Sequence, residues 1–199
     1  MHYICRMSYE AIHQYLRTCT ALSDAQLAHF DQFFIQKSVP ADQFLLRAGE
    51  VCAFEAFVLK GCIKTYYIDK QGKELILTFA TENWWVSDIM SFQEQTPGKM
   101  FIQTLEPCEL LLLTPQSKAR LLADIPELER MFRLMVQRHL GSIQERLFGF
   151  VGLSARERYA AFLEKYPHLP QRIPQYLIAA YLGITPEFLS RLRTSKRVS

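Results

Sequence analysis

Apolar residues recur at helical spacing in two short segments near the end of the sequence, with a glycine between them. Gly183 can adopt the positive φ that ends a helix. Thr185 is a suitable N-cap, Pro186 suits the first helical position, and Glu187 suits the positive end of a helix dipole. A start signal three residues after a stop signal is the spacing of a helix-turn-helix. The apolar positions are Leu177, Ala180 and Tyr181 in the first segment, and Phe188, Leu189 and Leu192 in the second.

An ordinary helical hairpin would show the same pattern, so the charge of the segment matters. From Arg172 onward the only acidic residue is Glu187. The basic residues are Arg172, Arg191, Arg193, Lys196 and Arg197. A second helix with arginines and a basic tail suits an element that binds phosphates and reads a groove of DNA. Ser190, Arg191, Arg193 and Thr194 are free to point outward, and we predict DNA contacts from Thr185, Glu187, Ser190, Arg191, Arg193 and Lys196.

A longer pattern begins at Ile125-Pro126-Glu127, which opens a long helix. Its apolar residues step by four, three, four and three, at Val136, Leu140, Ile143, Leu147 and Phe150. This heptad-like seam can pack against the chain's own β-domain or against a second copy. The helix length and the period near 3.5 favour a homodimer through residues 125–150. Met131, Phe132 and Met135 lie partly off the seam and are assigned to packing within the chain, and His139 is interpreted as structural.

The middle of the sequence has a β-type pattern in place of helical spacing. Between Val39 and about Thr114, short β-type runs alternate with turn signals, which predicts a jelly roll or small β-barrel. The expected strands lie within Phe57–Gly61, Ile63–Ile68, Leu75–Phe79 and Leu105–Leu113, with a hairpin turn at Asp69–Gly72. Before them, Tyr9–Phe34 reads as helical, with a capping box at Ser23–Gln26.

The remaining segments connect these parts. Pro115 opens a short helix, and Gly149–Ser154 is expected to interrupt the long one. Ser154–Glu157 resembles a capping box, and Pro167–Pro174 is a connection that could hold a short strand. The predicted fold is α+β: a β-roll sensor with flanking helices at 1–122, a long dimerisation helix at 123–151, and a helix-turn-helix domain at 152–199.

Composition narrows the function. The net charge is only +3, so any affinity for nucleic acid must come from local clusters. No apolar run reaches about 18 residues, and the N-terminus lacks the build of a signal peptide, so we expect a cytoplasmic protein without a membrane span. The five cysteines never form a CxxC pair, which argues against a disulfide framework and a metal or iron–sulfur site. An enzyme on a cupin-like barrel would need clustered histidine ligands, and the β-region has none. We therefore expect no enzyme activity, metal or cofactor.

The order helix, β-roll, long helix and helix-turn-helix resembles the cyclic-AMP receptor/fumarate-nitrate regulator (CRP/FNR) family of transcription regulators. The resemblance covers residues 10–193 and rests on Leu45–Glu50, Phe57–Gly61, Asp69–Glu74 and the helix-turn-helix. It implies a homodimer that binds a pseudo-palindromic site in double-stranded DNA, with RNA polymerase as a possible further partner. Glu187 and Arg191 match the positions where relatives contact bases and phosphate, whereas Pro186 replaces a frequent arginine, so base preference should differ.

The sensor half departs from the family. Relatives that bind cyclic nucleotides carry a Gly-Glu pair for the ribose and an Arg-Ser pair for the phosphate. Asp88 could replace the glutamate. The arginine that binds the phosphate with two parallel hydrogen bonds is missing, and Lys99 offers only a compact ammonium charge in its place. Losing that contact should weaken binding by about 2–5 kcal/mol, so we expect no cyclic-AMP binding. A different small-molecule effector would contact Trp85, Ser87, Asp88, Lys99 and Phe101, whose aromatic members could instead fill the pocket.

Two hypotheses follow. The first is a homodimeric DNA-binding transcription regulator in which a change at the β-roll reorients the long helices. The second is a β-roll ligand-binding or protein-interaction module whose head does not read DNA. Relatives usually continue into a β-hairpin wing, whereas this sequence ends at Arg197-Val198-Ser199. Either the wing is lost or it is reduced to the stretch before Ile173, and we expect weaker clamping of the DNA backbone.

Overall fold

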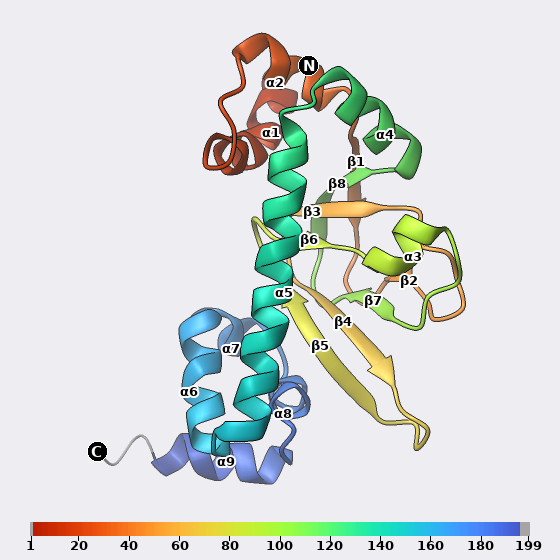
Figure 1. Ribbon diagram of the computed structural model, residues 1–199. Coiled ribbons are helices and arrows are strands. Elements are labelled where there is room, and N and C mark those ends of the chain that lie inside the picture. The colour runs from red at the N-terminus through yellow and green to blue at the C-terminus, as the bar shows by residue number, and fades with distance from the viewer. Residues whose placement is uncertain (1, 196–199) are drawn as a thin grey trace. The chain divides into compact units, whose positions relative to one another are not determined.

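The computed structural model describes the backbone of residues 2–195 and the side chains of residues 9–194. It divides into two compact units. The roll unit comprises Met1–Tyr66 and Phe79–Gln137, and the head unit comprises Tyr67–Thr78 and Arg138–Ser199. The division therefore passes through two strands and one helix that are each continuous (Figure 1).

The roll unit begins with two helices, α1 (His2–Arg17) and α2 (Asp24–Asp31). The predicted capping box is confirmed, because the Ser23 side chain accepts from the backbone of Gln26 and the Gln26 side chain bonds back to the Ser23 backbone. Such caps satisfy the free N–H groups at a helix start. The helices bury Ile12, Leu16, Leu27 and Phe30.

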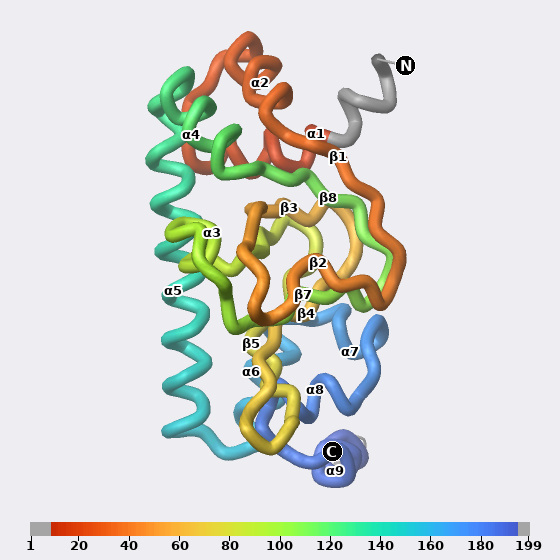
Figure 2. The backbone as a smooth tube through the Cα atoms, turned by 90° about the vertical axis from the view of Figure 1, so that its right-hand side faces the viewer, coloured from red at the N-terminus to blue at the C-terminus, as the bar shows by residue number. Residues whose placement is uncertain are grey.

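Among the described residues, eight strands form two four-stranded sheets, which confirms the predicted β-roll. They are β1 (Ile35–Val39), β2 (Phe44–Leu46), β3 (Glu55–Lys60), β4 (Ile63–Ile68), β5 (Glu74–Ala80), β6 (Trp85–Val86), β7 (Phe101–Thr104) and β8 (Cys108–Leu113). The sheet orders are β1-β8-β3-β6 and β2-β7-β4-β5, and β1 runs beside β8 in both views (Figures 1 and 2). Helix α3 (Ile89–Glu94) lies between β6 and β7 in the sequence.

Strand β3 contributes to two separate cores. Phe57 belongs to a core formed with the helices, whereas Ala56 and Val58 belong to the core inside the roll. This alternation follows from the pleat, which sends successive side chains to opposite faces. Val58, Ile63 and Ile102 are fully buried inside the roll, and each such side chain contributes about 1.5–3 kcal/mol relative to exposure.

Two further helices follow the roll. Pro115 occupies the first turn of α4 (Pro115–Asp124), where Thr114 is the N-cap, as the sequence indicates. The long helix α5 runs from Leu128 to Gly152. Its first turns bury Met131, Phe132 and Met135 in the core shared with α1, which confirms their predicted packing within the chain.

The head unit is helical apart from the tip of the β4–β5 hairpin. It contains the end of α5, followed by α6 (Ala155–Lys165), α7 (Leu169–Arg172), α8 (Gln175–Leu182) and α9 (Pro186–Ser195). The capping box at Ser154 and Glu157 is confirmed. Phe162, Tyr166 and Tyr181 form an aromatic cluster between α6 and α8, with ring centroids 5.3–6.1 Å apart.

One prediction for this region was wrong, and another was partly right, because the expected break at Gly149–Ser154 occurs at Leu153–Ser154. The connection Pro167–Pro174 holds the short helix α7 in place of a strand, because Leu169 and Pro170 begin a helical turn whose C-cap N–H, at Ile173, bonds to the Leu169 carbonyl. The long helix also continues through Gly149, which the sequence placed in an interruption, and ends at Gly152. Within residues 2–195, no helix combines the length and apolarity needed to cross a bilayer.

Candidate functional site

The turn between α8 and α9 has the geometry that the sequence predicts. Gly183 adopts φ 68° and ψ 33° at the end of α8. The Ile184 N–H donates to the Ala179 carbonyl at 3.0 Å, which closes the end of the helix. Two residues later, the Thr185 hydroxyl accepts from the Phe188 N–H at 3.2 Å and caps α9. The predicted helix-turn-helix is therefore present.

Gly183 is also required by close packing. A Cβ atom at this position would lie 2.7 Å from Cε1 of Phe150 on α5. The last member of the predicted seam, Phe150, thus contacts the helix-turn-helix turn.

We expect Gly183→Ala to destabilise the head unit by about 1–3 kcal/mol, because alanine is strained at positive φ and would also collide with Phe150. Thermal or urea denaturation of the full chain measures this change. Gly141→Ala is the matched control: a Cβ there meets nothing within 4 Å, and the change should stabilise α5 by about 1 kcal/mol. Equal stability of Gly183→Ala and the natural chain would contradict the argument.

Two arginines hold the end of α8 next to this turn. Arg146 donates to the Tyr181 carbonyl at 3.0 Å, and Arg158 donates to the Leu182 carbonyl at 3.2 Å. Both guanidinium groups lie 5.3 Å from the ring centre of Phe150. Cations are favourable at the negative end of a helix dipole, so this pair stabilises the end of α8.

One face of α9 is open to solvent. Leu189 is buried and Leu192 is half-buried, and these residues hold the helix against the head. Glu187, Ser190, Arg191 and Thr194 are exposed. Their spacing of three, four and seven residues places all four on one helical face. Three of them were predicted contact residues, and the structure adds Thr194, whose hydroxyl donates to the Ser190 carbonyl at 3.0 Å.

The other predicted contact residues have different positions. Thr185 uses its hydroxyl oxygen as the N-cap. Arg193 is exposed on the side of α9 that faces the start of α8, where it borders a hollow of about 360 Å³. That hollow is lined by Gln175, Pro186, Leu189, Ser190, Arg193 and Thr194. Lys196 lies outside the described residues.

The exposed face carries both signs of charge. The pKa of Glu187 is lowered because its carboxylate accepts hydrogen bonds from the Glu187 backbone N–H and from the Thr185 hydroxyl, and because Arg191 is nearby. The carboxylate therefore stays ionised. Arg191 extends over the Phe188 ring at 5.4 Å. An arginine can donate two hydrogen bonds to guanine, and a glutamate can accept one from cytosine. The face therefore has the groups needed to distinguish base pairs.

The structure separates the aromatic residues that the sequence grouped as a ligand platform. Trp85, on β6, packs with Phe57 at 5.3 Å and with Phe132 at 6.0 Å in the core shared with the helices. Phe101, on β7 in the other sheet, stacks on Tyr66 at 5.1 Å. The ring contacts of the two side chains therefore belong to different aromatic clusters.

Ser87 and Asp88 are bonded to the roll itself. The Ser87 hydroxyl donates to the Phe54 carbonyl at 2.9 Å. Buried Asp88 caps α3 by accepting from the Ser91 N–H at 3.2 Å. Gly98 lies so close that a Cβ there would collide with Oδ2 of Asp88. Lys99, next to Gly98, is exposed. Ser87 and Asp88 thus each have a hydrogen-bond partner within the roll.

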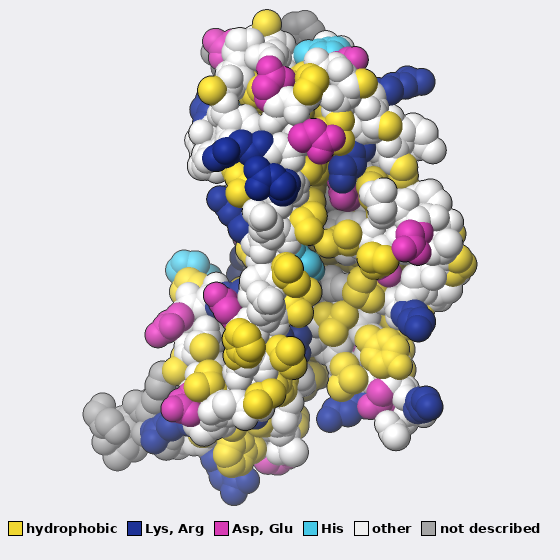
Figure 3. All heavy atoms as spheres, viewed as in Figure 1, with side chains coloured by type: hydrophobic (Ala, Val, Ile, Leu, Met, Phe, Trp, Pro, Cys, Tyr) yellow, Lys and Arg dark blue, Asp and Glu magenta, His cyan; other side chains and the backbone are white. Residues whose placement is uncertain are grey.

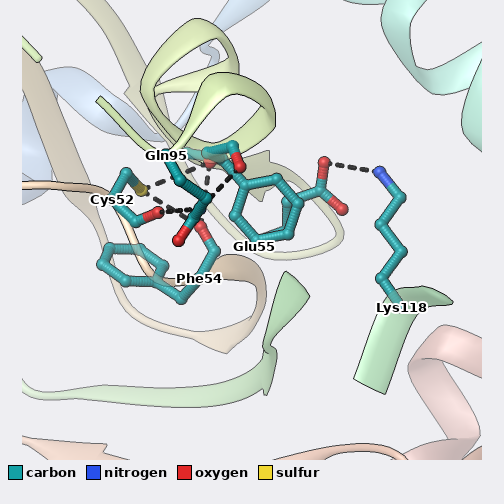
Figure 4. A network of polar contacts seen from close by, with 7 residues as sticks. Cys52, Phe54, Glu55, Gln95 and Lys118 are labelled. Carbon is teal, nitrogen blue, oxygen red and sulfur yellow. Dashed lines mark hydrogen bonds and ion pairs between the residues drawn. The ribbon is translucent and has the colours of Figure 1, made fainter. Parts of the chain in front are cut away.

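A polar network in the roll includes Cys52, Phe54 and Gln95 (Figure 4). The Gln95 amide donates to the Cys52 carbonyl at 3.3 Å and to the Phe92 carbonyl at 2.7 Å, which ties the end of α3 to the connection between β2 and β3. Nearby, Lys118 of α4 points toward Glu55 of β3, with Nζ 2.9 Å from Oε1. Burial raises the pKa of Glu55, and the charge and hydrogen bond of Lys118 oppose that rise.

Known proteins match both parts of the chain. A family model described as the cyclic nucleotide-binding domain matches residues 36–124. The cAMP-activated global transcriptional regulator CRP of Haemophilus influenzae is 24% identical over 132 residues, which cover 66% of this chain and 59% of that protein. The Fumarate and nitrate reduction regulatory protein of Vibrio cholerae is 26% identical over 185 residues, covering 86% of this chain and 72% of the relative. The chain thus spans less than two thirds of the CRP relative's length.

Solved structures show the same fold. FixK2 from Bradyrhizobium japonicum superposes with a TM-score of 0.74 at 16% identity, covering 83% of this chain and 85% of that one. The regulator CLP of Xanthomonas campestris gives 0.70 at 15% identity, covering 88% and 92%. The fold and head define the class: a cyclic-nucleotide-binding-type roll followed by a long helix and a helix-turn-helix. Within this class, the similarities to the cyclic nucleotide-binding domain and to these two regulators support the CRP/FNR family.

Proposed function

We propose that the protein is a homodimeric DNA-binding transcription regulator whose helix α9 reads the major groove. The carrying observation is the single exposed face formed by Glu187, Ser190, Arg191 and Thr194 on a capped, well-anchored helix. In helix-turn-helix proteins the second helix enters the groove with its N-terminal residues at the base edges. Arg193, on the flank of α9, would contact the DNA backbone.

A gel-shift assay on promoter fragments tests this proposal. Binding should weaken steeply as salt rises, because phosphate contacts release counterions. The alternative function, a β-roll ligand-binding or protein-interaction module, predicts no binding even at low salt. A pseudo-palindromic site with half-sites about 34–36 Å apart is expected for two symmetric heads. Such a regulator would work in the cytoplasm, with RNA polymerase as a further partner.

The proposed partner surface for a second copy lies on α5. Val136, Leu140, Ile143 and Leu147 are 43–59% exposed, although all are large and apolar. Figure 3 shows hydrophobic side chains gathered along this helix. The residues beside the seam are Arg133, Gln137, Arg138, Gln144 and Glu145, so the strip is flanked by both signs of charge and by two uncharged amides. A second copy would remove this strip from water.

We expect Leu140→Glu to dissociate the dimer. Each copy loses about 1.5–3 kcal/mol of apolar burial and gains a charge that faces its symmetry mate, so dimer affinity should fall by roughly a hundredfold or more. Sedimentation velocity at micromolar concentration measures the effect. Met90→Glu, at a 63% exposed apolar site on α3, is the control and should remain dimeric. A Leu140→Glu protein that stays dimeric would rule out this seam.

We also propose that the roll does not bind cyclic AMP. Its interior is filled by side chains such as Val58, Ile63 and Ile102, and Asp88 already caps α3. Titration calorimetry with cyclic AMP should give no heat of specific binding. A dissociation constant in the micromolar range would contradict this proposal and would restore the roll as a nucleotide sensor.

A further inference from the structure

Arg146 makes contacts that connect two different parts of the head unit. Its guanidinium donates to the carbonyls of Ile76 and Leu77 on β5. The same group donates to the Tyr181 carbonyl of α8 at 3.0 Å and lies 4.2 Å from the centre of the Tyr181 ring. One side chain of α5 thus bridges the hairpin and the first helix of the helix-turn-helix.

The acceptors explain why an arginine occupies this position. Strand β5 is at the edge of its sheet, so its outward carbonyls need partners from elsewhere. The Tyr181 carbonyl lies at the negative end of α8, which favours a cation. A planar guanidinium can serve several acceptors in fixed directions, whereas the ammonium of lysine is a compact point charge.

The hairpin also belongs to both units. Strand β4 leaves the roll unit after Tyr66, and β5 re-enters it at Phe79, whereas the residues between them belong to the head unit. The chain therefore passes between the units through the two hairpin strands as well as through α5. A displacement of β4 or β5 within the roll would move the hairpin tip.

We propose that Arg146 is a positioning residue that fastens strand β5 of the β4–β5 hairpin to α8, so that the hairpin and the helix-turn-helix move as one body. The roll then has a second mechanical route to the DNA-reading helix, in addition to α5. The effect on DNA binding rests on the proposed function. The attachment of the hairpin does not.

The hairpin turn contains two trypsin sites, Lys70 and Lys73, which provide a direct test in the full-length protein. Cleavage there reports how often the tip opens, because proteolysis follows the open population when opening is rapid. Arg146→Gln should increase cleavage at these two lysines by about tenfold or more, since three carbonyl contacts are lost. Hydrogen exchange should rise over residues 67–78 while α6 keeps its protection.

Two variants serve as comparisons. Arg133→Gln removes an exposed arginine from the same helix and should cleave at the natural rate. Arg146→Lys keeps the positive charge but loses the planar guanidinium. Its rate of trypsin cleavage should lie between those of the natural protein and Arg146→Gln. Arg146→Lys also keeps the test open if Arg146→Gln fails to fold. DNA affinity, measured by gel shift, should fall in the same order by about tenfold for Arg146→Gln.

The outcomes separate the two proposals. Unchanged hairpin protection in both Arg146 variants would overturn the attachment, whatever the DNA result. An opened hairpin with unchanged DNA affinity would overturn the positioning role. If the natural protein bound no DNA while Arg146→Gln still opened the hairpin, the proposed function would fail and the attachment would stand.

Discussion

Replacing Arg191 by alanine is expected to abolish sequence-specific DNA binding while leaving the dimer intact. Arg191 is exposed on the open face of α9, and its described ring contact is with Phe188. The fold therefore does not depend on it. A bidentate contact to a base contributes about 1–3 kcal/mol of discrimination, and a dimer would lose two. Specific affinity should fall by roughly thirtyfold to ten-thousandfold.

A gel-shift titration at several salt concentrations checks this result. If Arg191 reads a base, the variant should lose preference for its site while the salt dependence of nonspecific binding is retained. If Arg191 contacts phosphate, binding should weaken across all sequences and the salt slope should fall by about one per contact. Arg133→Ala serves as an exposed control. Unchanged site preference after loss of Arg191 would count against α9 as the reader.

The second large effect is expected at the ion pair between β3 and α4. The side chain of Glu55 is only 5% exposed and that of Lys118 is 19% exposed. Oε2 of Glu55 has no hydrogen-bond partner among the described residues, so Lys118 is its main compensation. Lys118→Met would leave a buried carboxylate without its counter-ion, which typically destabilises a protein by about 3–5 kcal/mol.

Urea denaturation measures this loss, and a double variant supplies the control. Changing Glu55 to leucine together with Lys118 to methionine replaces the pair by apolar groups, which is often neutral or stabilising. We therefore expect it to recover most of the stability. The single variant should also lose stability as the pH rises above the ordinary pKa of glutamate, because burial raises the pKa of folded Glu55 and favours its protonated form. A single variant as stable as the natural protein would refute this account.

The parts predicted from the sequence are those with strong local signals. Gly183 and Thr185 define a helix stop and start through backbone and capping chemistry, so the helix-turn-helix could be placed to the residue. Strands β3, β4, β5 and β8 have six or seven residues, long enough to show their character. Strands β2, β6 and β7 have only two to four, which is too short for a periodic pattern.

Other features depend on tertiary contacts that sequence spacing does not contain. Phe150 continues the heptad spacing of the seam, but it contacts the turn at Gly183. The partners of Arg146 are mostly backbone carbonyls, which carry no sequence signature. Trp84 and Trp85 look like one aromatic group, yet the strand pleat assigns Trp84 to the roll core and Trp85 to the helical core.

Strand β3 contributes side chains to both the roll core and the helical core, and this limits how far the roll could expand around a bound molecule. Ala56 and Val58 form its inner wall, while Phe57 between them touches Trp85, which in turn touches Phe132 at the base of α5. A guest molecule could not widen the inner wall without pressing these three rings outward. Because the interior is closely packed, we expect a displacement of the inner wall to be passed through Phe57 and Trp85 to Phe132 in the first turns of α5.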